Sequence, residues 1–174
     1  MKQAYYFDTD FAEEEVHKVL AFVNTLQPGD ELDFYIHSPG GYNHVMEAIK
    51  SILENCGYPV TLVASGEIAS SAFLLFYFSN LNKVILPNVV AVLHAISSEF
   101  DDREARQNSK YYKKTRIRLD NMNEQVIDIF KTYNVLSGED LEDYINGEDV
   151  LLLTHELKAV MENCPYGTYR EKIS

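Results

Sequence analysis

Two adjacent serines, Ser70 and Ser71, stand at the head of an apolar run in the segment GEIASSAFLLFYF. A buried hydroxyl costs free energy unless it finds a hydrogen-bond partner. Ser70 is therefore either satisfied locally, as the cap of the helix that follows it, or placed to react. A reactive serine needs a base to take its proton, an acid to orient that base, and amides to bind an oxyanion.

His94 is the candidate base, because it alone among the five histidines ends an apolar segment, VVAVLH. Asp149, in GEDVLLL, is the candidate acid, with Asp140 and Asp143 as rivals. Taken alone, each has a simpler explanation: His94 as a satisfied histidine at a strand end, and Asp149 as an ordinary turn residue.

The candidate oxyanion donors are backbone amides. The amide of Ser71 is expected to be one of the free N–H groups at the start of a helix. Gly41, with Gly40 as its neighbour in SPGG, lets the backbone approach a ligand closely. SPGG also serves as the turn that ends a strand.

The apolar spacing predicts strands that alternate with helices, and hence parallel β/α/β units of an α/β protein. Thr9 or Asp10 is expected to cap the first helix and Thr154 the last. Active groups in such sheets gather at the carboxyl ends of strands, where the serine pair falls. Strands are predicted over residues 1–8, 32–36, 60–64, 83–86, 89–94 and 151–153. Helices are predicted over residues 11–26, 43–56 and 101–133, and three further helices are predicted to begin near the serine pair, at residue 137 and at residue 154.

The composition limits the possible functions. The chain has 174 residues, 46% of them hydrophobic, which suits one domain with a real core. A formal net charge of −12 argues against nucleic acid and against anionic membranes as partners. Cys56 and Cys164 fit no metal-ligand spacing, so no metal is expected. A serine nucleophile with a histidine base and an acid needs no organic cofactor either, so none is expected. The N-terminus lacks the apolar core of a signal peptide, and the longest apolar stretch is far too short to span a bilayer; we therefore expect a cytoplasmic protein.

Four segments, IHSPGG, GEIASSAFLL, LPNVVAVLH and EDVLLLTHEL, occur in this order. They resemble the signature segments of the proteolytic subunit of the Clp protease (ClpP), a serine peptidase of the crotonase-like fold. In that family the segments read approximately YINSPGG, GxAASMGAFLL, LPNxxxMIH and RDxFLSAxEA. The resemblance covers about residues 30–165.

The resemblance implies that Ser70 is the nucleophile, His94 the general base and Asp149 the acid that orients it. Gly41 and the amide of Ser71 match the oxyanion-hole donors. A single domain over residues 1–174 is implied, built from repeated β-β-α units: a head over about 1–98 and 140–174, and a handle over about 99–139 through which two rings meet. The partners implied are polypeptide substrates and further copies of the chain, in a heptameric ring or double ring.

The chain also departs from the family pattern. Glu148 replaces an arginine that precedes the catalytic acid, Ala95 and Ile96 replace Gln-Pro, and Ser71 and Ala72 replace Met and Gly. The chain starts almost at its first strand, where the family carries a longer segment that helps to couple an AAA+ unfoldase, so we expect that coupling to be weakened. Two alternatives stay open: an inactive scaffold subunit, and a crotonase-fold acyl-CoA enzyme.

Overall fold

The computed structural model describes residues 1–97 and 110–171. The chain divides into two compact units, one formed by Met1–Leu93 with Leu151–Ser174 and one by His94–Val150. The expected division into a head and a handle remains a prediction.

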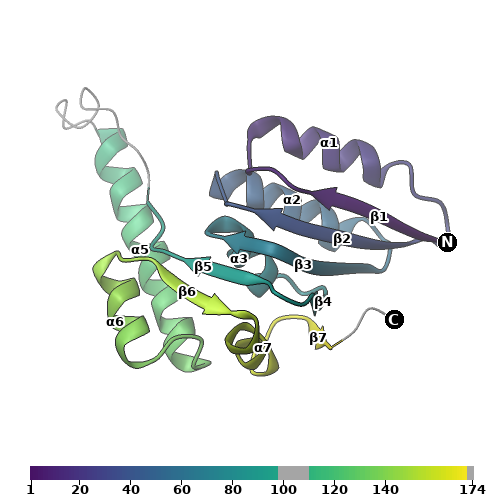
Figure 1. Cartoon of the computed structure of the whole chain (residues 1–174). Coiled ribbons are helices and arrows are strands. Elements are labelled where there is room, and N and C mark those ends of the chain that lie inside the picture. Colours follow the sequence, from purple (N-terminus) through teal and green to yellow (C-terminus); the bar gives the residue numbers. More distant parts are fainter. Residues whose placement is uncertain (98–109, 172–174) are drawn as a thin grey trace. The chain divides into compact units, whose positions relative to one another are not determined.

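The first unit is built on a mainly parallel sheet with the strand order β1-β2-β3-β4-β7 (Figure 1). Beyond this path, β5 pairs with β3, and β6 pairs with β5. The predicted α/β class is confirmed, and a short last strand that the sequence pattern did not indicate joins the sheet. The strands are β1 Lys2–Phe7, β2 Glu31–Ser38, β3 Val60–Ala69, β4 Asn82–Ile85, β5 Val90–Leu93, β6 Val150–Leu153 and β7 Thr168–Arg170.

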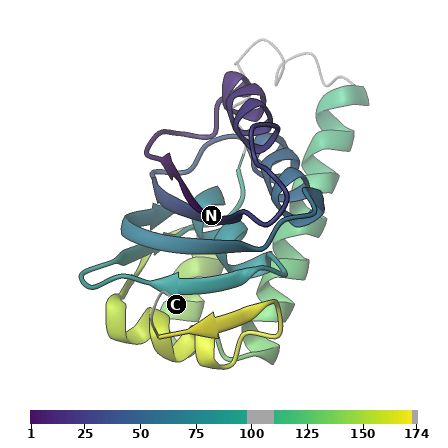
Figure 2. The same cartoon turned by 90° about the vertical axis from the view of Figure 1, so that its right-hand side faces the viewer.

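Three helices follow the first three strands: α1 (Glu13–Val23), α2 (Asn43–Asn55) and α3 (Ser71–Phe78). Figures 1 and 2 together show α1 and α2 side by side on one side of the sheet. Helix α2 contacts both α1 and α3. Every residue of α3 except Phe78 is buried, so α3 lies inside the core and needs no polar face. The last helix, α7, spans Thr154–Glu162.

Three local expectations were wrong. The first helix begins at Glu13, not at Phe11, and neither Thr9 nor Asp10 caps it, because Phe11 forms a parallel β-bridge with Gly41. Strand β3 continues through Gly66 to Ala69. Thr154 does not cap α7: its hydroxyl donates to the carbonyl of Val89, at 2.7 Å.

The second unit contains α5 (Lys110–Thr132) and α6 (Gly138–Asn146). The ring of Phe130 packs against that of Tyr144, with centroids 5.3 Å apart. The side chain of Asn123 makes two hydrogen bonds to the backbone of Ile96, both at 2.8 Å. The predicted long helix over 101–133 corresponds to α5; its first part, 101–109, lies outside the described residues.

Across the described ranges, no helix has the length and apolar character of a membrane span.

Lys83 is an unusual buried charge of the first unit, with a side chain that is 0% exposed. Its ammonium donates to the carbonyl of Tyr77 at 2.8 Å and to the carbonyl of Tyr166 at 2.6 Å. It therefore joins the end of α3 to the C-terminal segment that carries β7. Burial lowers the pKa of Lys83 from 10.5 to about 8.

We expect Lys83→Met to change how stability depends on pH. The folded pKa lies below the unfolded one, so the wild type gains stability as pH rises from about 8 towards 10.5, by up to about 3 kcal/mol. The variant lacks this rise. Urea unfolding of both proteins at several pH values between 8 and 10 measures the difference. An equal rise in both proteins would contradict the assignment.

Candidate active site

Ser70 lies between strand β3 and helix α3 in a strained backbone conformation. Its φ is 54° and its ψ is −123°. Such a conformation costs about 1–3 kcal/mol for a residue with a Cβ, and persists only where the surroundings enforce it. Here the amide of Ser70 donates to the carbonyl of Val92 at 2.8 Å, and its carbonyl accepts from the amide of Leu74 at 3.1 Å. A strained serine at a strand-to-helix turn presents its hydroxyl outward, as in a nucleophile elbow.

The hydroxyl of Ser70 is not used as a helix cap. Ser70 is the N-cap residue of α3, but its side chain makes no capping hydrogen bond. Within the described part of the first unit, no other hydrogen bond to this hydroxyl is found either. The capping explanation for Ser70 therefore lacks the contact on which it depends.

Gly40 and Gly41 bring the loop after β2 against this serine. A Cβ added to Gly40 would lie 2.6 Å from the Cβ of Ser70 and 3.2 Å from its Oγ, and the φ of Gly40 is 103°. A Cβ on Gly41 would lie 2.6 Å from the backbone nitrogen of Phe11. Both positions consequently require glycine, for space as well as for backbone conformation.

Phe11 holds this loop through its backbone. Its amide donates to the carbonyl of Gly40 at 2.7 Å, and its carbonyl accepts from the amide of Tyr42 at 3.0 Å. This role could not be read from the sequence, because backbone hydrogen bonds do not depend on the identity of the side chain.

The two candidate oxyanion donors lie close to Ser70. The amide of Ser71 follows it in the chain, the amide of Gly41 belongs to the loop that packs on it, and neither donates to a described backbone acceptor. The Ser71 side chain is fully buried, and its hydroxyl donates to the carbonyl of Gly41 at 3.3 Å. Ser71 thus ties the glycine loop to α3. Two such amides beside a free hydroxyl can bind the oxyanion of an acyl-transfer intermediate.

His94 and Asp149 belong to the second unit. His94 directly follows β5, and its Nδ1 lies 3.0 Å from the carbonyl oxygen of Ala95. Since a carbonyl oxygen only accepts, this hydrogen bond places the proton on Nδ1 and leaves Nε2 free to accept one. Asp149 is exposed and directly precedes β6. Its rivals Asp140 and Asp143 both lie on α6.

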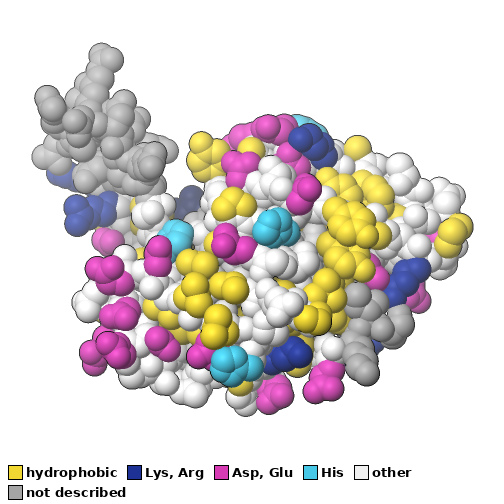
Figure 3. All heavy atoms as spheres, in the orientation of Figure 1, with side chains coloured by type: hydrophobic (Ala, Val, Ile, Leu, Met, Phe, Trp, Pro, Cys, Tyr) yellow, Lys and Arg dark blue, Asp and Glu magenta, His cyan; other side chains and the backbone are white. Residues whose placement is uncertain are grey.

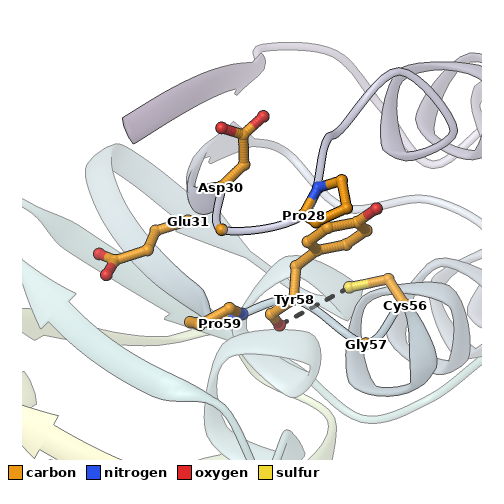
Figure 4. A pocket seen from close by; sticks show the side chains of 8 residues that line it. Pro28, Asp30, Glu31, Cys56, Gly57, Tyr58 and Pro59 are labelled. Atoms are coloured by element: carbon orange, nitrogen blue, oxygen red, sulfur yellow. Dashed lines mark hydrogen bonds between the residues drawn. The ribbon is translucent and has the colours of Figure 1, made fainter. Parts of the chain in front are cut away.

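A pocket of about 590 Å³ lies at the other end of the strands. It is lined by residues such as Asp30, Tyr58 and Pro59, just before β2 and β3 begin (Figure 4). Ser70 follows the end of β3, so this pocket does not contain it.

In the part of the chain that the structure describes, no three His, Cys, Asp or Glu side chains cluster as metal ligands would.

We expect Gly40→Ala to damage the site more than Gly57→Ala does. Both glycines have positive φ, 103° and 80°, but a Cβ meets Ser70 at position 40 and nothing within 4 Å at position 57. The Gly57 variant should lose about 1–2 kcal/mol of unfolding free energy from backbone strain alone. The Gly40 variant should lose more, as measured by urea denaturation. Equal losses would show that the loop does not pack on Ser70 as described.

Comparison with known proteins agrees with this architecture. The model of the Clp protease family matches residues 6–153. A search of curated proteins gives no match. Among solved structures, a point mutant of ClpP1 from Listeria monocytogenes is similar in fold, with a TM-score of 0.64 and 18% sequence identity over 97% of this chain and 91% of that one. The match to the family model spans most of the chain, and the protein therefore belongs to the Clp protease family.

Proposed function

We propose that this protein is a serine endopeptidase that hydrolyses peptide bonds with Ser70 as its nucleophile. The observation that carries the proposal is the state of Ser70: a strained backbone, no capping hydrogen bond, and a neighbouring glycine loop with a free amide. Membership of the Clp protease family supports the same chemistry. A serine that served only packing or capping would not need this conformation.

In the proposed mechanism, Nε2 of His94 takes the proton of Ser70 as Oγ attacks the peptide carbonyl carbon. The hydrogen bond from Nδ1 to the carbonyl of Ala95 supports the tautomer that this step requires. Asp149 is the proposed acid that stabilises the imidazolium once it forms. Ala95 stands where the family pattern has Gln, and its carbonyl shares the orienting task.

The oxyanion formed on the carbonyl oxygen is bound by the amides of Gly41 and Ser71. His94 then gives its proton to the leaving amine, and the peptide C–N bond breaks to leave an acyl ester on Ser70. Water attacks this ester with His94 again as base, which releases the acid and restores the hydroxyl. The hydrogen bond from the Ser71 hydroxyl to the carbonyl of Gly41 holds together the two residues whose amides are the proposed oxyanion donors.

The proposed working form is an assembly of identical chains that acts on polypeptides, as a ring or a double ring. Strand β6 supports this, because Leu151 and Leu153 are 56% and 47% exposed on one side of it. Figure 3 shows hydrophobic side chains gathered over β6. Apolar patches of this kind mark surfaces that another protein covers. A cytoplasmic location is proposed for this assembly.

The nucleophile is tested by measuring intact mass after treatment with a fluorophosphonate, with Ser51→Ala on the exposed surface of α2 as the matched control. Ser70 would displace fluoride from phosphorus, which adds one phosphonyl group. We expect one adduct on the wild type and on the control, and none on Ser70→Ala. If a folded, assembled wild type gains no adduct, the protein is an inactive scaffold subunit instead. An adduct that persists in Ser70→Ala would place the reactive group elsewhere.

The assembly is tested by changing its exposed leucines. A charge placed in an apolar contact is costly to desolvate, so Leu153→Asp should lower the mass seen by light scattering from a multiple of the 19.9 kDa chain towards one chain. Ile117→Asp, at an exposed position of α5, tests whether that helix joins rings. A wild type that already runs as a single chain at micromolar concentration would contradict the proposed assembly.

A further inference from the structure

Strand β3 carries a bulge just before Ser70. Ile36 of β2 pairs with Ala64 of β3, but the next pair is Ser38 with Ile68. Between these pairs β2 has one residue, His37, whereas β3 has the longer segment 65–67. A bulge of this kind bends a strand and re-aims the side chains that follow it.

The bulge is also where β3 exchanges one of its two neighbouring strands, while β2 stays paired on the other edge. Before it, β3 pairs with β4, up to the pair of Ala64 with Ile85. After it, β3 pairs with β5, from Glu67 with Val90 to Ala69 with Val92. The second pairing delivers Ser70 to the carbonyl of Val92, which holds its strained backbone. The position of Ser70 therefore depends on the shape of the bulge.

The side chain of His37 contacts the bulge. Its Nδ1 accepts a hydrogen bond from the amide of Glu67 at 3.0 Å. A Cβ on Gly66 would lie 2.7 Å from the same nitrogen, so the ring rests directly on the bulged backbone. A second hydrogen bond joins the same strands: the hydroxyl of Ser65 donates to the carbonyl of Ile36 at 3.1 Å.

His37 is also the last residue but one of β2, and the loop that carries Gly40 and Gly41 follows Ser38. His37 contacts the bulge through its side chain, and its backbone leads through Ser38 and Pro39 to the proposed oxyanion loop. An amide can only donate, so the contact with Glu67 requires an imidazole whose Nδ1 carries no proton. This is the opposite arrangement to His94, whose Nδ1 must carry one.

We propose that His37 is a positioning residue, which fixes the β3 bulge through the Glu67 amide and so sets Ser70 against the glycine loop. The inference rests on the proposed function, because positioning matters only if Ser70 reacts. His37 is exposed and needs no partner for its own solvation, so the hydrogen bond serves the bulge and not the histidine. A shift of about 1 Å in a reacting group can cost a hundredfold in rate.

The test compares the second-order rate of fluorophosphonate labelling in three variants with the wild type. His37→Leu fills similar space but cannot accept, and should label about tenfold to a hundredfold more slowly. His37→Asn places an amide oxygen near the position of Nδ1, and should restore the rate to within about threefold, since its side chain can accept the same hydrogen bond. His17→Leu, at an exposed position on α1, is the matched control and should label like the wild type.

The outcomes separate the two proposals. Labelling of His37→Leu at the wild-type rate overturns the role of His37 but leaves Ser70 as the nucleophile. Equal slowing in the Leu and Asn variants also overturns it, because the hydrogen bond would then not be the cause. If His37→Leu does not fold, the rate of His37→Ala relative to His37→Asn decides in the same way. If the wild type gains no adduct, the proposed function is wrong, and the role of His37, which rests on that function, is wrong as well.

Discussion

The hydrogen bond from the amide of Ser70 to the carbonyl of Val92 is the contact on which the site depends. A positive φ at a serine is unfavourable, and the chain adopts it only because the pairing of β3 with β5 fixes the residues that precede Ser70. The buried helix α3 supplies the other anchor, since its apolar side chains cannot leave the core without large cost. The strain at Ser70 is thus offset by the packing of the sheet and α3.

Most of the fold of the first unit, and the place of Ser70 between a strand and a helix, could be predicted from the sequence. The alternation of strands and helices is encoded in apolar spacing, and the four ordered segments pointed to the family that the comparison then established. The serine at the strand-to-helix junction and the glycines of SPGG follow from the same patterns. These features share one property: each is a matter of residue type within a short window.

The parts that could not be predicted arise from pairing between distant segments. Nothing in residues 11–26 indicates that Phe11 forms a β-bridge with Gly41. Because of this bridge, the first helix begins only at Glu13. The extension of β3 through Gly66 was missed because glycine ordinarily weakens a strand, whereas here it gives the bulge its positive φ. Nothing in the sequence around Lys83 marks it as buried. Its ammonium can be buried because the carbonyls of Tyr77 and Tyr166 accept the hydrogen bonds that water would otherwise accept.

The departures from the family pattern acquire a physical meaning in this structure. Ser71, which stands where the pattern has Met, contributes a hydroxyl that bonds the carbonyl of Gly41. A methionine could fill that space but could not donate this bond. Ala95, which stands where the pattern has Gln, bonds His94 through a backbone carbonyl, which every residue type possesses. The Ser71 hydroxyl therefore provides a contact that a methionine could not, and the contact of His94 does not depend on which side chain stands at position 95. Both hydrogen bonds end on main-chain carbonyls, so a substitution at the accepting residue leaves its acceptor atom in place.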